Sequence, residues 1–241
     1  MKRKHEMSSR DFATELIESY IVDHGLVTDD RLPSERDMCE MWDLNRTTLR
    51  NAIKRLIDSG LLYSKTGSGT YVAPPKLVRN LQDVSGFSEA VRNSGRVPGS
   101  RLVHAALREA DKTVARKLRV TLGTEVFSVR RVRSIDGVSC SIETAVVNTE
   151  RCAGIEQHDF ERESLADVLR WDYGIKVVSG DEKISVTTLD AAEAELLGME
   201  EGHPAFYTSG VTMDADGKPV ESYRIVALSE RIRYATEMTA R

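Results

Sequence analysis

Apolar residues in the first part of the chain recur every three or four positions, which is the spacing of a helix with one buried face. Residues 8–24 form one such series and predict a first helix that ends before a glycine. A shorter second helix is predicted over 34–42, with Ser34 as its N-cap. A third series runs over 46–59 and also stops at a glycine. The pattern therefore predicts three helices in close succession.

Two short apolar runs follow the third helix. Residues 61–63 and 70–72 predict strands, and the glycine-containing segment 64–69 between them predicts a hairpin. Three helices followed by a hairpin is the order of a winged helix-turn-helix. Two prolines close this unit, so we expect a DNA-binding domain over 1–75 and a linker over 76–82.

The remaining residues, 83–241, contain an internal near-repeat. At a constant spacing, the following residues recur: Asp111, Ala115, Leu118, Val120, Gly123 and Phe127 as Asp190, Ala194, Leu197, Met199, Gly202 and Phe206. Each copy predicts a helix, a strand, an Asp-Gly turn and a second strand, and a further helix is expected over 164–171 between the copies. This order predicts an α+β domain built on an antiparallel sheet.

Composition agrees with two ordinary domains, because the 241 residues are 40% hydrophobic and 30% charged. No apolar run is long enough to cross a bilayer, and no secretion signal begins the sequence, so we expect a cytoplasmic protein with no membrane partner. The three cysteines, Cys39, Cys140 and Cys152, have no histidine at metal-ligand spacing. We therefore expect reduced thiols, no metal and no cofactor.

The net charge of −4 is unfavourable for binding a polyanion, but the charges are unevenly distributed. The segment 44–72 holds five lysines and arginines and a single carboxylate, Asp58. One face of the first domain is therefore expected to be electropositive.

The third helix of a winged helix-turn-helix enters the major groove with its N-terminus first. Arg46 stands at that position and is the strongest candidate for reading a base, whereas Arg36 on the second helix is suited to a phosphate. Small residues in the hairpin would let the wing backbone approach the sugar-phosphate edge. The candidate DNA-contacting residues are Arg36, Asn45, Arg46, Thr47, Thr48, Arg50, Lys65, Gly67, Ser68 and Gly69.

A possible ligand site is marked by the alternation of the strand over 126–133, which puts Arg131 and Arg133 on one face. Side chains two residues apart on a strand are about 7 Å apart, so the pair can hold one anionic group. Ser164 opens the helix that follows, and helix starts favour anions.

The strands of the two copies supply further polar groups. Glu143 and Glu221 offer acceptors, and Tyr223 offers an aromatic wall. These residues also allow a purely structural interpretation. Arg131 would pair with Glu143 across the hairpin, and Ser164 would only cap its helix. The residues alone favour this second interpretation.

Specific motifs resemble a known family. The stretches Leu32-Pro-Ser-Glu-Arg36, Asn45-Arg-Thr-Thr-Leu-Arg50, Gly60-Leu-Leu62 and Gly67-Ser-Gly-Thr70 closely resemble the DNA-binding domain of the GntR family. Residues from about 80 to 236 resemble the UTRA effector domain of its HutC branch, which is related in fold to chorismate lyase. The resemblance implies that the effector is bound by residues including Arg131, Arg133, Glu143, Ser164, Leu165, Glu221 and Tyr223.

The resemblance also implies a partner and a mechanism. We expect a homodimer that binds a palindromic operator and is released by a small anionic effector such as a sugar phosphate. Three departures weaken the expectation of a sugar phosphate. Ala166 and Ala227 stand where many phosphosugar-binding members have tyrosine, and Leu228 stands where an arginine is often found. A larger or less polar anion would fill that space.

Two other functions remain open from the sequence. The chain could be a ligand-independent dimeric regulator, with the second domain serving only to dimerise. It could also be an enzyme of the chorismate-lyase type fused to a DNA-binding domain. The five histidines are scattered and no nucleophile motif is present, so we expect no enzymatic activity.

Overall fold

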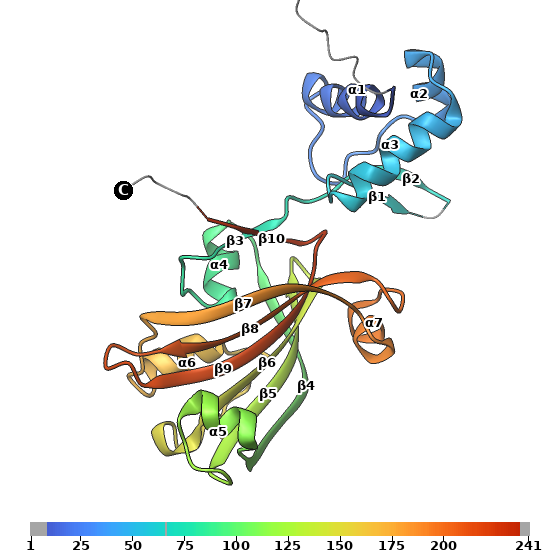
Figure 1. The fold of residues 1–241 in the computed structure, drawn as a ribbon. Coiled ribbons are helices and arrows are strands. Elements are labelled where there is room, and N and C mark those ends of the chain that lie inside the picture. Colours follow the sequence, from blue (N-terminus) through green and yellow to red (C-terminus); the bar gives the residue numbers. More distant parts are fainter. Residues whose placement is uncertain (1–8, 66, 237–241) are drawn as a thin grey trace, which may run out of the picture. The chain divides into compact units, whose positions relative to one another are not determined.

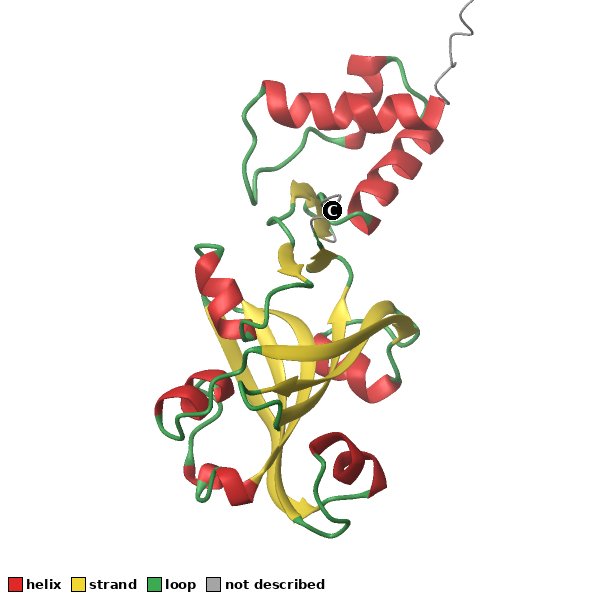
Figure 2. Ribbon diagram, turned by 60° about the vertical axis from the view of Figure 1, so that its left-hand side comes forward, coloured by secondary structure: helices red, strands yellow, loops and turns green. Residues whose placement is uncertain are grey.

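The computed structural model describes residues 9–65 and 67–236, and the chain divides into two compact units, Met1–Lys76 and Leu77–Arg241. The first unit contains three helices and a hairpin, and the second contains a six-stranded sheet with helices on both faces (Figures 1 and 2). None of the described helices is both long and apolar enough to span a bilayer.

The first unit has the predicted order of elements. These are α1 (Ser9–Asp23), α2 (Glu35–Trp42), α3 (Arg46–Asp58), β1 (Leu62–Lys65) and β2 (Gly69–Val72). The predicted N-cap of α2 is confirmed, because the Ser34 side chain accepts a hydrogen bond from the Asp37 N–H at 3.2 Å. The apolar faces of the helices and the hairpin meet in one core that includes Ile17, Met38, Leu49, Ile53 and Leu62.

A third extended segment joins the hairpin of the first unit. The backbone N–H of Asp29 donates to the carbonyl of Val72 at 3.0 Å, and that of Leu32 donates to Thr70 at 2.9 Å. Arg31 between them forms a bridge with Tyr71. The wing is therefore a hairpin with a short extra edge, which the sequence pattern did not predict.

The second unit is longer and mostly β. Its elements are β3 (Leu77–Asn80), α4 (Phe87–Asn93), β4 (Pro98–Glu109), α5 (Lys112–Leu118), β5 (Glu125–Ile135), β6 (Val138–Asn148), the 3-10 turns Thr149–Arg151 and Ile155–Gln157, α6 (Leu165–Trp171), β7 (Ser179–Thr188), α7 (Ala191–Leu197), β8 (Pro204–Met213), β9 (Pro219–Leu228) and β10 (Ile232–Ala235). The antiparallel sheet has the order β4-β5-β6-β9-β8-β7. Each half is therefore one copy of a strand, helix, strand, strand unit, and β6 and β9 join the halves.

The sheet register confirms the internal repeat. Asp111 caps α5 and Asp190 caps α7, each by accepting hydrogen bonds from backbone N–H groups of its helix. In the first copy Arg131 lies directly opposite Glu143. The repeat places Gly210 at the position equivalent to Arg131, and its cross-strand partner is Tyr223.

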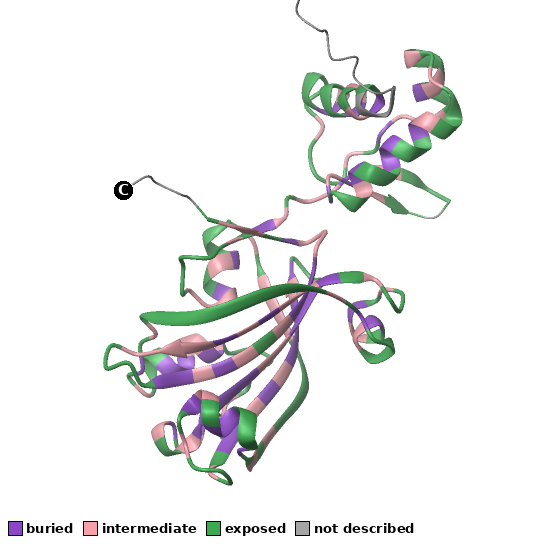
Figure 3. Cartoon of the chain, in the orientation of Figure 1, coloured by how far each residue is buried: buried purple, intermediate pink, exposed green. Residues whose placement is uncertain are grey.

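Helices cover both faces of this sheet, so its central strands are buried (Figure 3). On one face α6 packs on a cluster that includes Phe127 and Val147, and α4 packs near Ala227. On the other face α5 and α7 pack on Val126 and Val132. The alternation of the strands thus separates two sets of side chains, and the candidate site lies on the face of α4 and α6.

The expected linker over 76–82 is corrected by the structure. Residues Leu77–Asn80 form β3, which pairs in parallel with β10. Leu77 is buried against Val91 and Ile232, so this segment has a fixed place in the second unit. The sequence did not reveal this, because the partner strand lies at the far end of the chain.

Candidate nucleic-acid interface and ligand cavity

The start of α3 presents the candidate base-reading residues to solvent. Arg46 and Thr47 are exposed, and Arg46 makes no ion pair with any residue that the structure describes. The Asn45 side chain is the N-cap of this helix and accepts a hydrogen bond from the Thr48 N–H at 2.8 Å. Asn45 therefore orients the helix start, and its carbonyl oxygen is already engaged.

Two other candidate arginines are held by neighbouring carboxylates. Arg36 lies 2.9 Å from Glu40, and Arg50 lies 3.0 Å from Glu35. Both pairs are exposed, and such pairs contribute little to stability, so a phosphate can replace the carboxylate at small cost.

The wing carries a fixed cation. The ammonium group of Lys65 lies over the Tyr71 ring at 4.8 Å and over the Tyr63 ring at 5.4 Å from the centroids. Ser68 and Tyr71 are hydrogen-bonded through their hydroxyl groups at 2.6 Å. Gly67 and Gly69 both have positive φ, at 72° and 133°. The two tyrosines were missed from the sequence because each reads as an ordinary strand residue.

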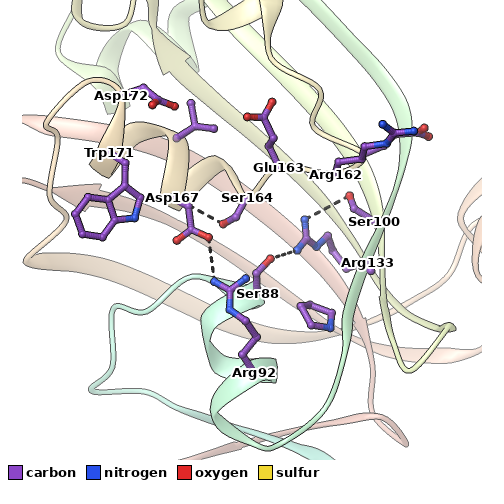
Figure 4. Close-up of a pocket in the computed structure, with 14 residues that line it drawn as sticks. Ser88, Arg92, Ser100, Arg133, Arg162, Glu163, Ser164, Asp167, Trp171 and Asp172 are labelled. Atoms are coloured by element: carbon purple, nitrogen blue, oxygen red, sulfur yellow. Dashed lines mark hydrogen bonds and ion pairs between the residues drawn. The ribbon is translucent and has the colours of Figure 1, made fainter.

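A cavity of about 470 Å³ lies between α4, α6 and the edge of the sheet in the second unit (Figure 4). Its polar lining residues include Ser88, Arg92, Ser100, Arg133, Arg162, Ser164 and Asp167. Arg133 is 3% exposed and donates to the hydroxyl of Ser88 at 2.7 Å and to that of Ser100 at 3.4 Å. Its guanidinium also lies 4.5 Å from the centroid of the Phe87 ring.

The charge of Arg133 is only partly compensated. Its Nε has no hydrogen-bond partner among the described residues, although the atom is buried. Burial lowers the pKa of Arg133 to about 10. The charge of Glu143 opposes this shift, and the charge of Arg131 adds to it. The group remains protonated at neutral pH, so an anion in the cavity would meet a buried cation with unused hydrogen-bonding capacity.

Three of the carboxylates around this cavity already have partners. Asp167 pairs with Arg92 at 2.9 Å, which joins α4 to α6 (Figure 4). Glu161 and Glu163 accept hydrogen bonds from backbone N–H groups at 3.0 and 2.8 Å. Their negative charge is thus oriented by the protein, and the serine hydroxyls and Arg133 remain the groups suited to a ligand.

Arg131 does not line this cavity and instead pairs with Glu143 across the hairpin, as the structural interpretation of the sequence predicted. Arg131 is 2% exposed, and its Nε and Nη1 lack partners among the described residues. Burial raises the pKa of Glu143, but the charges of Arg131 and Arg133 outweigh it and keep that pKa below its ordinary value.

A second cavity of about 360 Å³ adjoins the first and shares Asp167 with it. Its floor includes Glu143, Glu221 and Tyr223. Burial, and then the charge of Glu143, raises the pKa of Glu221 to about 7 against the opposing effect of Arg131. The phenol of Tyr223 donates to Glu182 of β7 at 3.1 Å.

Among residues 9–65 and 67–236, no group of histidine, cysteine and carboxylate side chains is arranged to hold a metal ion. The three cysteines are free thiols.

Comparison with known proteins identifies both units. A model of the UTRA domain matches residues 93–233, and a model of bacterial regulatory proteins of the gntR family matches residues 10–72. The chain belongs to the gntR family and carries a UTRA domain. The predicted family, HutC-type organisation and α+β fold class are therefore confirmed.

Named relatives cover nearly the whole chain. The HTH-type transcriptional repressor NagR of Bacillus subtilis (strain 168) is 26% identical over 93% of this chain and 92% of its own length. The HTH-type transcriptional repressor PhnF of Mycolicibacterium smegmatis is 30% identical over 90% of this chain and 88% of its own. The crystal structure of PhnF from Mycobacterium smegmatis aligns with a TM-score of 0.69 at 28% identity, covering 95% of this chain and 100% of that one. The chain is a DNA-binding transcriptional regulator with an effector domain.

The UTRA domain divides five of the predicted effector residues between the two cavities. Arg133 and Ser164 line the first cavity, and Glu143, Glu221 and Tyr223 line the second. Ser164 also caps α6, since its hydroxyl accepts a hydrogen bond from the Asp167 N–H at 3.4 Å. Both structural roles that the sequence allowed, the cap and the Arg131 pair, are thus present beside the cavities.

Leu165 does not line either cavity, because its side chain is buried in the core with Val168 and Phe160. The two alanines also differ from expectation. Ala166 lines the second cavity, but Ala227 is fully buried in another cluster of the core. Only the alanine at 166 therefore enlarges a cavity, and packing fills the space beside the one at 227.

Several cavity residues were not predicted from the sequence. Ser88 and Arg92 come from α4, and Ser100 comes from the edge strand β4. None stands in a motif, and α4 is a seven-residue helix in a polar stretch, so no pattern marks these residues as neighbours of Arg133.

Proposed function

We propose that this regulator is a homodimeric repressor that leaves its operator when a small anionic molecule binds beside Arg133. One observation carries the effector half: the Arg133 guanidinium is 3% exposed, lines a cavity of about 470 Å³ and keeps a nitrogen without a partner among the described residues. A cavity of this volume suits a small metabolite. Since its partner is chromosomal DNA, the protein would act in the cytoplasm.

The DNA half rests on the start of α3. Arg46 and Thr47 are exposed at the helix end that enters a major groove, and Arg46 is suited to a guanine. Arg36, Arg50 and Lys65 are exposed and would bind phosphates of the DNA backbone. One winged helix covers only a short half-site, so a two-fold dimer on a palindromic operator follows.

The two cavities together favour an effector with an anionic end and a hydroxyl-bearing end. The anionic group would replace Ser88 as the partner of Arg133 in the first cavity. Hydroxyls would donate to Glu143 and Glu221 in the second. A sugar phosphate has this chemistry, and the small side chain of Ala166 leaves room for a larger molecule of the same kind.

Helix α4 offers a route from the cavity to the DNA-binding unit. Phe87 and Ser88 of this helix both contact Arg133. A ligand that replaces these contacts with Arg133 would change the free energy of α4 in its present position. Along the chain, β3 begins directly after the boundary at Lys76, and α4 is the next helix. Coupling requires only that the ligand bind more tightly to one arrangement of the chain than to another.

The DNA assignment is tested by substituting Arg46 in the full-length chain. A DNA fragment is first selected from random duplexes by the purified protein, and its symmetry is read by footprinting. Arg46→Ala should weaken binding to that fragment by about 1–3 kcal/mol without changing the melting temperature. Arg116→Ala, an exposed arginine of α5, is the control. Equal affinities for both variants would remove Arg46 from the reading surface.

The effector assignment is tested by a thermal-shift screen of sugar phosphates and organic acids, followed by operator release. A compound that stabilises the protein should release the DNA, and Ser88→Ala should change its affinity several-fold. Ser94→Ala at the C-terminal cap of α4, where the hydroxyl bonds to the Val91 carbonyl, is the matched control. A compound that binds tightly and leaves DNA affinity unchanged would instead support the ligand-independent regulator. A compound that is chemically converted would support the enzyme.

A further inference from the structure

The wing has an outward face whose composition is only partly explained by the DNA contacts proposed above. Leu62 and Val72 point into the core of the first unit. Because side chains alternate along a strand, their neighbours in the hairpin point away from the core. The outward residues are Tyr63, Lys65, Gly69 and Tyr71, which are cross-strand partners of one another.

Arg31 adds a second cation to this face. Its backbone bridges to Tyr71, so its side chain joins the outward set. A Cβ built on Gly69 would lie 2.9 Å from Nε and 3.3 Å from Nη2 of Arg31. The guanidinium therefore lies against the backbone of the wing, in space that any other residue at 69 would occupy. We use "wing platform" for Arg31, Tyr63, Lys65, Gly69 and Tyr71.

The charges of the wing platform are held in place. The rings of Tyr63 and Tyr71 stack at 5.5 Å, and the Lys65 ammonium lies over both. The Tyr63 phenol donates to Asp29 at 2.5 Å, which fixes its ring. A hydrogen bond with Tyr63 raises the pKa of Lys65, so the ammonium stays charged.

The charge of Arg31 is not neutralised by its neighbours. Asp29 accepts from Tyr63, and Asp30 accepts from the Val27 N–H at 2.7 Å. Arg31 is exposed and makes no ion pair within the described part of the chain, in contrast to Arg36 and Arg50. An exposed guanidinium that lies beside the wing backbone and has no carboxylate partner among the described residues is available to bind an oxyanion.

We propose that Arg31 is a second phosphate-binding side chain of the wing, and that Gly69, whose φ of 133° already favours glycine, also leaves the space in which the Arg31 guanidinium lies. This rests on the DNA-binding function and extends it to a residue outside the helix-turn-helix. From the sequence, Gly69 was expected to let the wing backbone approach DNA. In the structure, the Arg31 guanidinium lies in the space beside Gly69 that a Cβ would occupy. A phosphate contact carries no base information, so Arg31 contributes equally to operator and unrelated DNA.

The experiment measures binding of the full-length chain to two duplexes, the selected fragment and an unrelated sequence, over a range of salt concentrations. Arg31→Ala should weaken both complexes about five- to tenfold at low salt. The slope of log K against log salt concentration should fall by about 0.9, the value for one phosphate contact. Arg31→Lys keeps the charge and should retain most of the slope. Arg116→Ala should behave as the wild type.

The outcomes separate this proposal from the DNA-reading assignment. Arg46→Ala should weaken only the selected complex, whereas Arg31→Ala should weaken both. If Arg31→Ala keeps the wild-type slope while Arg46→Ala loses selectivity, the phosphate contact is refuted and the DNA-reading residue stands. Circular dichroism should show an unchanged fold, because Arg31 is exposed.

A double-mutant cycle tests the role of the glycine. Gly69→Ala should displace the Arg31 guanidinium and weaken DNA binding in the wild-type background. The same substitution should have a much smaller effect on DNA binding when combined with Arg31→Ala. Equal losses in both backgrounds would show that Gly69 serves the backbone, through its positive φ or its approach to DNA, and does not seat Arg31.

Discussion

The two halves of the six-stranded sheet share one backbone plan but carry different chemistry on the face that holds the cavities. In the first half, Arg131 lies opposite Glu143 and forms a buried ion pair. In the second half the equivalent pair is Gly210 and Tyr223. A Cβ at Gly210 would collide with the Tyr223 ring, so the glycine makes room for an aromatic side chain where the first half has a charged pair.

The next pair along the same strands differs as well. Arg133 is paired with Ser141 in the first half, and Thr212 is paired with Glu221 in the second. The first half therefore presents buried cations, and the second presents a carboxyl and a phenol. A duplicated scaffold has given a site with one end suited to an anion and another suited to hydrogen-bond donors. This asymmetry resides in side chains alone, so substitutions can break it one residue at a time.

The largest effect is expected from the ion pair of the first half. Arg131→Met leaves the Glu143 carboxylate buried without its cation, and breaking a buried pair in this way costs about 3–5 kcal/mol of unfolding free energy. Urea denaturation followed by circular dichroism measures the loss. The double variant Arg131→Met, Glu143→Leu removes both charges and should recover most of the stability. A single variant as stable as the wild type would show that the pair is not a fixed part of this half.

The same comparison shows what the sequence could predict. The helices of the first unit, the N-cap of α2 and the repeat in the second unit were predicted because each depends on a local pattern of residues. Ser34 is one example, since a helix cap is a local contact. Arg131 and Arg133 were correctly placed on one face of a strand because alternation is a property of every strand.

What escaped prediction depends on distant partners. The edge strand β7 is exposed along almost its whole length and has no apolar alternation. The strand β3 exists because β10, at the other end of the chain, pairs with it. Ser88 reaches Arg133 only after α4 packs on the sheet, and no motif marks it. Tertiary packing therefore decided which of the predicted residues meet in a cavity.

A smaller effect, and one that depends on pH, is expected at Glu221 in the second half. Its pKa is raised from 4.5 to about 7 in the folded protein. Between these values the unfolded chain releases a proton that the folded chain keeps, so the wild type loses stability as the pH rises through this window. Glu221→Gln has no titrating group, so its stability relative to the wild type should rise by about 1–3 kcal/mol between roughly pH 4.5 and pH 8.

Thermal and urea unfolding of both proteins across this pH range tests the expectation. Glu182→Gln is the matched control, because Glu182 is exposed on the edge strand of the same half and already accepts from Tyr223. Parallel stability curves for Glu221→Gln and the wild type would contradict the raised pKa. They would also show that the Glu221 carboxyl is better solvated in the folded protein than its burial indicates.

The smallest effect is expected from the phenol of Tyr223. Tyr223→Phe removes a 3.1 Å hydrogen bond to the exposed Glu182 but keeps the ring that covers Gly210, so the loss should be only about 0.5–1 kcal/mol. Tyr223→Ala removes the ring as well and should cost about 3 kcal/mol or more. Tyr207→Phe on the opposite face of β8 is the control. If the phenylalanine variant were as unstable as the alanine variant, the hydrogen bond to Glu182 would be the main stabilising contact of Tyr223. A phenylalanine variant that is much more stable than the alanine variant would show that packing of the ring stabilises the second half, as the Arg131 ion pair stabilises the first.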